Sequence, residues 1–226
     1  EDIFNATARE LLKDEYWVNR KVVISGGGTV EKIDEVRYIS NFSSGKMAAA
    51  MAKALYFKGA DVCLVSTRGY EEVPKDIHVI PVQSSDEMKN FLVDAIRVAK
   101  KGTLTKATLM DSSRPELIQK RAFLFMIAAV SDYIPSFPQN GKMKKDMIGE
   151  TWNLELKQNI DILETLDKND LVTIGFKAEM DKASASNSAI AMLEKKNLDG
   201  VCLNVLDDSN SFGSINNEIE LLLKDN

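Results

Sequence analysis

The sequence has little of what several large protein classes require. Among its 226 residues it has one histidine, His78, and two cysteines, Cys63 and Cys202, and it contains no CxxC pair. Both cysteines lie inside apolar runs, which is typical of reduced strand residues in a cytoplasmic protein and argues against a disulfide scaffold or a structural zinc site. A Ser-His-Asp triad would depend on His78, which lies in the strand-like run IHVIPV. We therefore predict no metal site built from protein side chains.

Long hydrophobic runs and an excess of basic residues are also absent. No apolar stretch approaches the length of a membrane span, and the N-terminus lacks the layout of a signal peptide. The chain has 29 Lys and Arg against 34 Asp and Glu, so its formal net charge is −5. A nucleic-acid-binding protein needs a concentrated basic face, which this balance disfavours. We therefore predict neither a membrane protein nor a partner of nucleic acid.

The apolar residues that are present alternate between strand-like and helix-like segments. Compact apolar runs predict strands at 21–25, 61–66, 77–82, 123–130, 171–178 and 199–205. Helical spacing predicts helices at 2–17, 46–59, 85–100, 160–168 and 182–197. Partial alternation predicts half-exposed strands at 152–157 and 218–223, whereas 29–42 and 101–120 look irregular, with a short helix expected at 115–121.

This order of segments predicts an α/β fold. We expect a three-layer, Rossmann-like domain with a mostly parallel sheet, helices on both faces and extra half-exposed strands. Residues 1–19 are expected to be a linker helix from a preceding domain, because the chain begins with Glu rather than Met, and residues 20–226 to be the functional domain. In such sheets ligands bind at the carboxyl ends of the strands. Unusual residues collect at those ends: Gly26–Gly28, Ala128–Asp132, Phe176–Glu179 and Asn204.

Two segments of the sequence, 26–28 and 43–45, have features of an anion site. Three glycines at 26–28 permit positive φ and the close approach of an anion, although the GxGxxG spacing of dinucleotide-binding turns is absent. Ser43, Ser44 and Gly45 precede an alanine-rich helix, so their hydroxyls and the first N–H groups would lie at the positive end of the helix dipole. Simple N-capping by Ser43 or Ser44 explains the serines equally well.

A third segment combines small residues, a carboxylate and lysines. Ala128 and Ala129 let a ligand lie against the backbone, and Asp132 can accept a hydrogen bond from a ligand hydroxyl, amine or metal-bound water. Lysines at 142, 144 and 145 follow a loop that contains proline and glycine, so 133–150 is expected to be a lid that closes over phosphate charge. The alternative is an ordinary solvated charge run.

Together these segments resemble the phosphopantothenoylcysteine synthetase family. Six motifs occur in the family's order: IDEVRYISNFSSGKM at 33–47, AAVSDY at 128–133, KMKK at 142–145, NIDIL at 159–163, IGFKAE at 174–179 and NLDGVCLNV at 197–205. The resemblance covers residue 20 to the C-terminus. In many bacteria this domain is similar to the C-terminal half of a bifunctional flavoprotein, so FMN is expected only in the N-terminal decarboxylase half.

The resemblance implies a ligase of coenzyme A biosynthesis. The carboxylate of 4′-phosphopantothenate would attack the α-phosphate of CTP, giving an acyl-cytidylate and pyrophosphate. The amine of L-cysteine would then attack the acyl carbon and release CMP. It further implies CTP rather than ATP, Mg²⁺ on the triphosphate, a homodimer and a cytoplasmic location.

The same resemblance assigns roles to residues. Lys142 would neutralise triphosphate charge, Asn41 would handle the acyl-cytidylate, and Arg37 would hold the pantothenate side, from the partner subunit of a dimer. The predicted cofactor-binding residues are Gly27, Ser43, Gly45, Met126, Ile127, Ala128, Asp132, Lys142, Ile160, Asp161, Ile162, Leu163, Phe176, Lys196 and Asn204. The predicted substrate-binding residues are Arg37, Asn41, Ala128, Ala129 and Asp132.

Two departures and two alternatives accompany this interpretation. Ala48 stands where a glycine commonly follows SSGKM, and Met192 stands where bacterial relatives often carry a second nucleotide-binding lysine. A nicotinamide-dependent oxidoreductase would need a tighter glycine turn and an acidic residue at the end of the second strand, which instead ends in Ser66. A non-catalytic nucleotide-binding domain is the other alternative, and it would be expected to lack Asn41 or Lys142.

Overall fold

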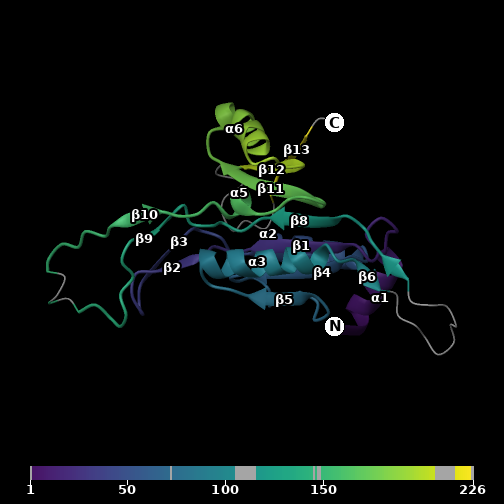
Figure 1. Cartoon of the computed structure of the whole chain (residues 1–226), viewed down its shortest axis with the longest axis horizontal. Helices are drawn as coiled ribbons and strands as arrows, with labels where there is room; N and C mark the ends of the chain where they lie inside the picture. Colours follow the sequence, from purple (N-terminus) through teal and green to yellow (C-terminus); the bar gives the residue numbers. More distant parts are fainter. Residues whose placement is uncertain are drawn as a thin grey trace.

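A computed structural model describes residues 2–71, 73–104, 116–144, 146, 149–206 and 217–224. Its centre is a seven-stranded sheet in the order β13-β12-β11-β8-β1-β4-β5 (Figure 1). The strands are β1 (Lys21–Gly26), β4 (Asp61–Ser66), β5 (His78–Pro81), β8 (Ala122–Met126), β11 (Leu171–Glu179), β12 (Gly200–Val205) and β13 (Glu220–Leu223). Only β13 is antiparallel to its neighbour, so the mostly parallel α/β sheet is confirmed.

Helices cover both faces of this sheet, as predicted. They are α1 (Asp2–Leu12), α2 (Lys46–Phe57), α3 (Ser85–Ala99), α5 (Ile162–Thr165) and α6 (Lys182–Lys195). Successive strand residues point to opposite faces. In β1, Val23 packs in one core with Leu92 of α3, whereas Ile24 packs in the other with Ala52 of α2. Helices α3 and α6 therefore cover one face, and α2 covers the other.

Two antiparallel hairpins extend from the carboxyl end of the sheet, at the left of Figure 1. One pairs β2 (Val30–Lys32) with β3 (Tyr38–Ser40), and the other pairs β9 (Tyr133–Pro135) with β10 (Leu156–Gln158). A third short pair, β6 (Thr103–Leu104) with β7 (Leu117–Ile118), lies at the opposite end. The expectation of an irregular segment at 29–42 was therefore wrong, and the strand expected at 152–157 begins only at Leu156.

Some predicted element boundaries were also wrong. The strand expected at 123–130 ends at Met126, because the Ser25 hydroxyl takes the N–H groups of Ile127 and Ala128 away from the strand ladder. The helix expected at 115–121 is replaced by β7, whose backbone groups are satisfied by pairing with β6. The helix expected at 160–168 is a single turn, α5. Lys145 and residues 105–115 of the irregular segment lie outside the described residues.

Helix α1 packs on the domain itself. The Arg9 guanidinium donates to the carbonyl oxygens of Tyr56, Gly59 and Ala60, at the C-terminal end of α2, and lies over the Tyr56 ring. A cation at this end of a helix is favoured by the helix dipole. The helix ends at Leu12, earlier than the predicted 2–17, and the chain then turns at Asp14, whose carboxylate accepts from Tyr16 N. Every helix in the part of the chain described here is too short or too polar to cross a lipid bilayer.

Candidate functional site

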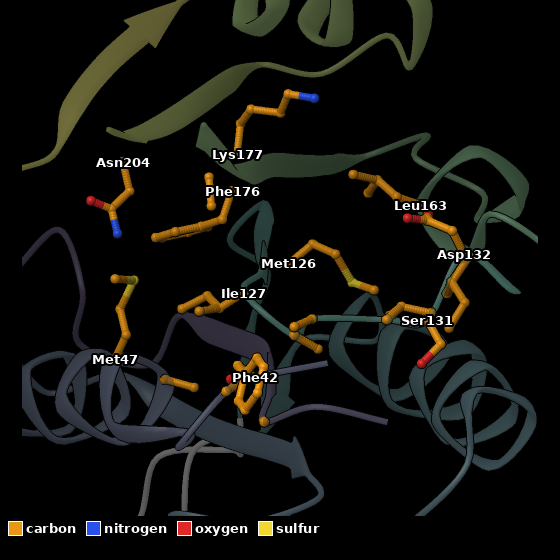
Figure 2. A pocket seen from close by; sticks show the side chains of 18 of the residues that line it. Phe42, Met47, Met126, Ile127, Ser131, Asp132, Leu163, Phe176, Lys177 and Asn204 are labelled. Carbon is orange, nitrogen blue, oxygen red and sulfur yellow. The ribbon is translucent and has the colours of Figure 1, made fainter. Parts of the chain in front are cut away.

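A cavity of about 700 Å³ lies at the carboxyl ends of the central strands, between α2 on one side and α5 and α6 on the other (Figure 2). Its volume is in the range of small-molecule and cofactor sites. The lining of the cavity includes every predicted cofactor-binding residue except Lys142. It also includes Ala129, which was predicted to bind substrate. The structure therefore brings together motifs that are separated by up to 177 positions, from Gly27 to Asn204.

The floor of the cavity is held by hydroxyl groups that the sequence interpretation missed. Ser25 Oγ accepts from the backbone N of Ile127 and of Ala128, both at 3.1 Å. Thr29 Oγ1 accepts from Ser131 N at 3.0 Å. Both hydroxyl residues are fully buried, and a polar group buried at a strand end needs a partner. This requirement could have marked Ser25 and Thr29 as residues with a hydrogen-bonding role. It does not reveal which distant residue is the partner.

The α2 wall presents the start of a helix to the cavity. The N-cap is Gly45, in the left-handed region at φ 76°, and no side chain caps it. Ser44 Oγ accepts from Lys46 N at a long 3.4 Å, so the simple capping role for the serines has weak support. A Cβ on Gly45 would lie 2.3 Å from the Arg68 carbonyl oxygen, so glycine is required for this approach. The first N–H groups of a helix need outside acceptors, and an anion in the cavity would supply them.

The opposite wall carries two ion pairs. Lys196 Nζ lies 2.6 Å from Asp161 Oδ2, and Lys177 Nζ lies 3.2 Å from Glu179 Oε1. Burial would raise the pKa of Asp161, but the Lys196 ammonium and the Glu164 N–H outweigh it and hold that pKa below its usual value. Lys177 was not predicted as a single site residue; Figure 2 shows its side chain directed away from Phe42 and Met47.

Asn159, another residue absent from the predicted site, joins two of the cavity loops. Its Nδ2 donates to the Ser131 carbonyl oxygen at 2.8 Å and to Ser85 Oγ at 2.9 Å. Its backbone N donates to the Asp132 carbonyl oxygen at 2.7 Å. The exposed Asp132 side chain, labelled in Figure 2, therefore extends from a loop that is fixed on both sides. Asn159 is the first residue of the NIDIL motif, but the predicted cofactor-binding residues begin one position later, at Ile160.

The three predicted catalytic residues lie outside the lining of this cavity. Asn41 is adjacent, since its Nδ2 donates to the carbonyl oxygen of Val130, a lining residue, at 3.1 Å. Arg37 is bonded to Asp34 in the β2–β3 turn and lines a separate hollow of about 370 Å³. Lys142 follows Gly141 in the chain between β9 and β10, residues 136–155, called here the β9–β10 arm. It is next to Met143, whose N–H donates to Asp34. The structure thus groups Arg37 with Lys142 near the β2–β3 turn, apart from the main cavity.

Both departures from the family pattern have packing consequences. Ala48 is 1% exposed, and a Cβ on Gly26 would lie 2.6 Å from its methyl carbon, so Ala48 fills a close helix–strand contact. Met192 lines the cavity and lies over Gly175, where a Cβ would come within 2.8 Å of its methyl group. Neither residue supplies charge.

Within the described part of the chain, the cysteines and acidic residues do not form a reactive or metal-binding group. Burial raises the pKa of the Cys63 thiol to about 11 and also raises the pKa of the Cys202 thiol, so both stay protonated near neutral pH. Among the described residues, no three His, Cys, Asp or Glu side chains gather where they could hold a metal ion.

A parallel α/β sheet with a nucleotide-sized cavity across its strand ends, beside a glycine-capped helix, defines the Rossmann-like class of ligand-binding domains. The sequence model of one family within this class, the DNA/pantothenate metabolism flavoprotein C-terminal domain, matches residues 17–104 and 93–226. The chain belongs to this family.

Known relatives agree with this assignment. The chain is 34% identical over 212 residues to the coenzyme A biosynthesis bifunctional protein CoaBC of Vibrio cholerae, covering 92% of this chain and 47% of that protein. It is 34% identical over 210 residues to CoaBC of Bacillus subtilis, covering 91% and 45%. A protein described as cysteine/cysteine sulfinic acid decarboxylase, from an unknown prokaryotic organism, is 33% identical, covering 92% and 52%. The chain spans about half the length of the curated relatives it matches.

Solved structures share the fold. The C-terminal domain of a CoaBC protein matches with a TM-score of 0.63 and 24% identity, over 92% of this chain and 88% of that one. A Cab2 mutant in complex with phosphopantothenate-cysteine matches with a TM-score of 0.60 and 17% identity, over 99% and 87%. These similarities confirm the Rossmann-like α/β architecture.

Proposed function

We propose that this chain is a phosphopantothenate–cysteine ligase that joins 4′-phosphopantothenate to L-cysteine and uses CTP as co-substrate. The observation that carries the proposal is the cavity, which combines a helix N-terminus without a side-chain cap, a floor of small residues and a wall of paired lysines. Family membership and the similarity to CoaBC proteins support the same activity. In the first step a substrate carboxylate oxygen bonds to the α-phosphorus and pyrophosphate leaves. In the second, the cysteine nitrogen bonds to the acyl carbon, CMP leaves and the nitrogen loses a proton.

The α2 wall is the proposed phosphate site. Backbone N–H groups after Gly45 and the hydroxyls of Ser43 and Ser44 can donate to phosphate oxygens without first losing a charged partner. Ala128 and Ala129 leave room for the nucleotide against the strand ends. Mg²⁺, when bound, would neutralise the triphosphate, and the exposed carboxylate of Asp132 could bind it or its waters.

Asn41 lies where the two halves of the reaction would meet. Its amide donates one N–H to Val130, and an amide carries a second N–H that can donate to an acyl-phosphate oxygen. Lys142 is carried by the neighbouring β9–β10 arm and would add positive charge beside the triphosphate. Together they would position and stabilise the charged transition state, which is the main task in nucleotidyl transfer.

The setting of the enzyme is part of the same proposal. We infer a homodimer, a cytoplasmic location and a linker role for residues 1–19, with FMN confined to the other half of bifunctional relatives. The description of the CoaBC relatives as bifunctional supports the last two points. Sedimentation equilibrium of the chain would test the homodimer directly, and a monomer at all concentrations would contradict it.

A nucleotide panel tests the activity. CTP, ATP, GTP and UTP are each mixed with the protein, phosphopantothenate, cysteine and Mg²⁺, and pyrophosphate release and product mass are followed. We expect turnover with CTP, a Lys142→Gln variant slowed at nucleotidyl transfer, and a Lys144→Gln control close to wild type. Turnover with ATP alone would overturn the choice of base. Nucleotide binding without any product would overturn the ligase in favour of a non-catalytic domain.

A further inference from the structure

The buried carboxylate of Asp34 has more hydrogen-bond donors than its turn requires. Its side chain is 0% exposed and lies between β2 and β3. Oδ1 accepts from the backbone N of Val36 at 2.8 Å and of Arg37 at 2.7 Å, which closes the turn. Oδ2 accepts from the Arg37 guanidinium and, at 3.2 Å, from the backbone N of Met143, which is 109 positions later in the chain. The two oxygens therefore bond different parts of the molecule.

Arg37 extends this contact to both limbs of the β9–β10 arm. Its Nη2 donates to the Met143 carbonyl oxygen at 2.9 Å, and its guanidinium carbon lies 4.7 Å from the centre of the Trp152 ring. A backbone bond from Gln139 N to the Ile33 carbonyl oxygen, at 2.9 Å, lies nearby. The arm and the β2–β3 hairpin run together at the left of Figure 1. The Asp34–Arg37 pair thus holds Met143 by both its N–H and its carbonyl group.

We propose that Asp34 is a positioning residue for the ligase reaction: its Oδ2 anchors the arm at Met143, so that Lys142, the preceding residue, is presented from a fixed point. The proposal rests on the proposed function, because the role of Lys142 does. A lysine on an unanchored loop would sample many positions, and the electrostatic stabilisation of a transition state depends on preorganised charge. The anchor lies outside the main cavity, so it acts through Lys142 and not through contact with the nucleotide.

The ionised form of Asp34 suits this role. The Arg37 guanidinium is the main cause that holds the pKa of Asp34 well below its usual range, and backbone N–H groups, including that of Met143, add to it against the effect of burial. The carboxylate therefore remains an acceptor on both oxygens throughout the neutral range. Asn at this position would keep one oxygen for the turn but present an NH₂ group to the Met143 N–H and to the guanidinium.

A double-mutant cycle tests the anchor. Single-turnover formation of the acyl-nucleotide is measured for wild type, Asp34→Asn, Lys142→Gln and the double variant. We expect Asp34→Asn to slow this step by roughly tenfold to a hundredfold, the scale of a misplacement of about 1 Å, while the dissociation constant for CTP stays within about twofold. In the Lys142→Gln background the same substitution is expected to have little further effect. An equal slowing in both backgrounds would show a general structural role and overturn the proposal.

A matched control and a second measurement distinguish a failure of the proposed anchor from a failure of the proposed function. Asp94→Asn removes another i,i+3 Asp–Arg pair, on the exposed surface of α3, and is expected to leave the rate unchanged. Hydrogen exchange of the Met143 amide should be faster in Asp34→Asn than in wild type, and an unchanged rate would overturn the anchor alone. A wild-type protein that forms no acyl-nucleotide would instead overturn the proposed function. If Asp34→Asn does not fold, Met143→Pro removes the same N–H from the other partner.

Discussion

The two walls of the cavity hold charge in opposite ways. The α2 wall offers backbone N–H groups and serine hydroxyls around Gly45, which are neutral donors fixed by the helix. The opposite wall, formed by α5, α6 and the end of β11, offers lysines, but Lys196 is paired with Asp161 and Lys177 with Glu179. An anion can bind the first wall without displacing a partner, whereas at the second it competes with a carboxylate. We infer that the first wall sets nucleotide affinity and the second adjusts it.

The largest expected effect on nucleotide affinity comes from a substitution that distorts the start of α2. Gly45→Ala forces a Cβ to within 2.3 Å of a backbone carbonyl oxygen, at a residue with φ 76°. The left-handed conformation alone costs about 1–2 kcal/mol for a residue with a Cβ, and relief of the clash would shift the start of α2. We expect CTP affinity to fall by at least about tenfold, a loss of roughly 1.4 kcal/mol, with a lower melting temperature. Calorimetric titration and thermal unfolding measure the two effects.

Gly149→Ala provides the control for backbone strain. Gly149 has φ 79°, but a Cβ there would meet nothing within 4 Å among the described residues. It therefore carries the conformational penalty without the clash. If Gly149→Ala weakened CTP as strongly as Gly45→Ala, the contrast between the walls would be wrong.

The sheet and its cavity were far easier to predict than the contacts that hold them. Compact apolar runs are buried on both faces of a parallel sheet, so the strand at 61–66 was predicted with its observed bounds. The cavity residues were predicted from motifs in family order, and the fold brought them together. Ser25, Thr29 and Asn159 were missed because their partners are residues distant in sequence, and no local pattern specifies such a pair.

The hairpins were missed for a related reason. Strands β2 and β3 are three residues long, which is too short for a period-two pattern to show. Their turn depends on Asp34, whose carboxylate bonds two nearby N–H groups and one from Met143. Spacing could suggest the local turn, but only the structure reveals the bond to the arm. The expectation of a lid at 133–150 was made without this contact, which holds Met143, the residue after Lys142, to the β2–β3 turn.

A smaller effect on CTP affinity is expected at the Lys196–Asp161 ion pair of the second wall, and two variants should change it in opposite directions. Lys196→Met leaves the Asp161 carboxylate facing the cavity, and we expect CTP affinity to fall by about tenfold, the scale of one lost charge-assisted hydrogen bond. Asp161→Asn keeps a cap for α5 and releases Lys196 for the anion, so affinity should stay equal or rise. Both variants break the same pair. Equal losses of affinity in both would show that the pair matters only for folding.

The second pair should show the same pattern more weakly. Lys177 Nζ lies 3.2 Å from Glu179 Oε1, farther than the 2.6 Å of the Lys196–Asp161 pair. Water screens both partly exposed pairs, so the longer pair is expected to interact more weakly. We expect Lys177→Met to weaken CTP by about threefold and Glu179→Gln to strengthen it by a similar factor, on the scale of a partly exposed pair. Competition titrations with a fluorescent nucleotide can resolve this difference. Lys195→Met, on an exposed side chain of α6 outside the cavity lining, is the matched control, and an effect there as large as at Lys177 would remove the assignment.

The smallest expected effect is the response of the second wall to acid. The pKa of Asp161 is lower in the folded protein than its ordinary value of 3.8, so above that value its ion pair contributes fully to stability. As pH falls below 3.8, the unfolded chain binds a proton that the folded chain does not, and the contribution is lost as pH passes through the folded pKa. The melting temperature of wild type should therefore exceed that of Asp161→Asn near neutral pH and converge with it in acid. The two melting temperatures are measured from pH 7 to well below 3.8. A constant difference between them would mean that the charge of Asp161 does not stabilise this wall. The contrast with the uncharged α2 wall would then lose its electrostatic basis.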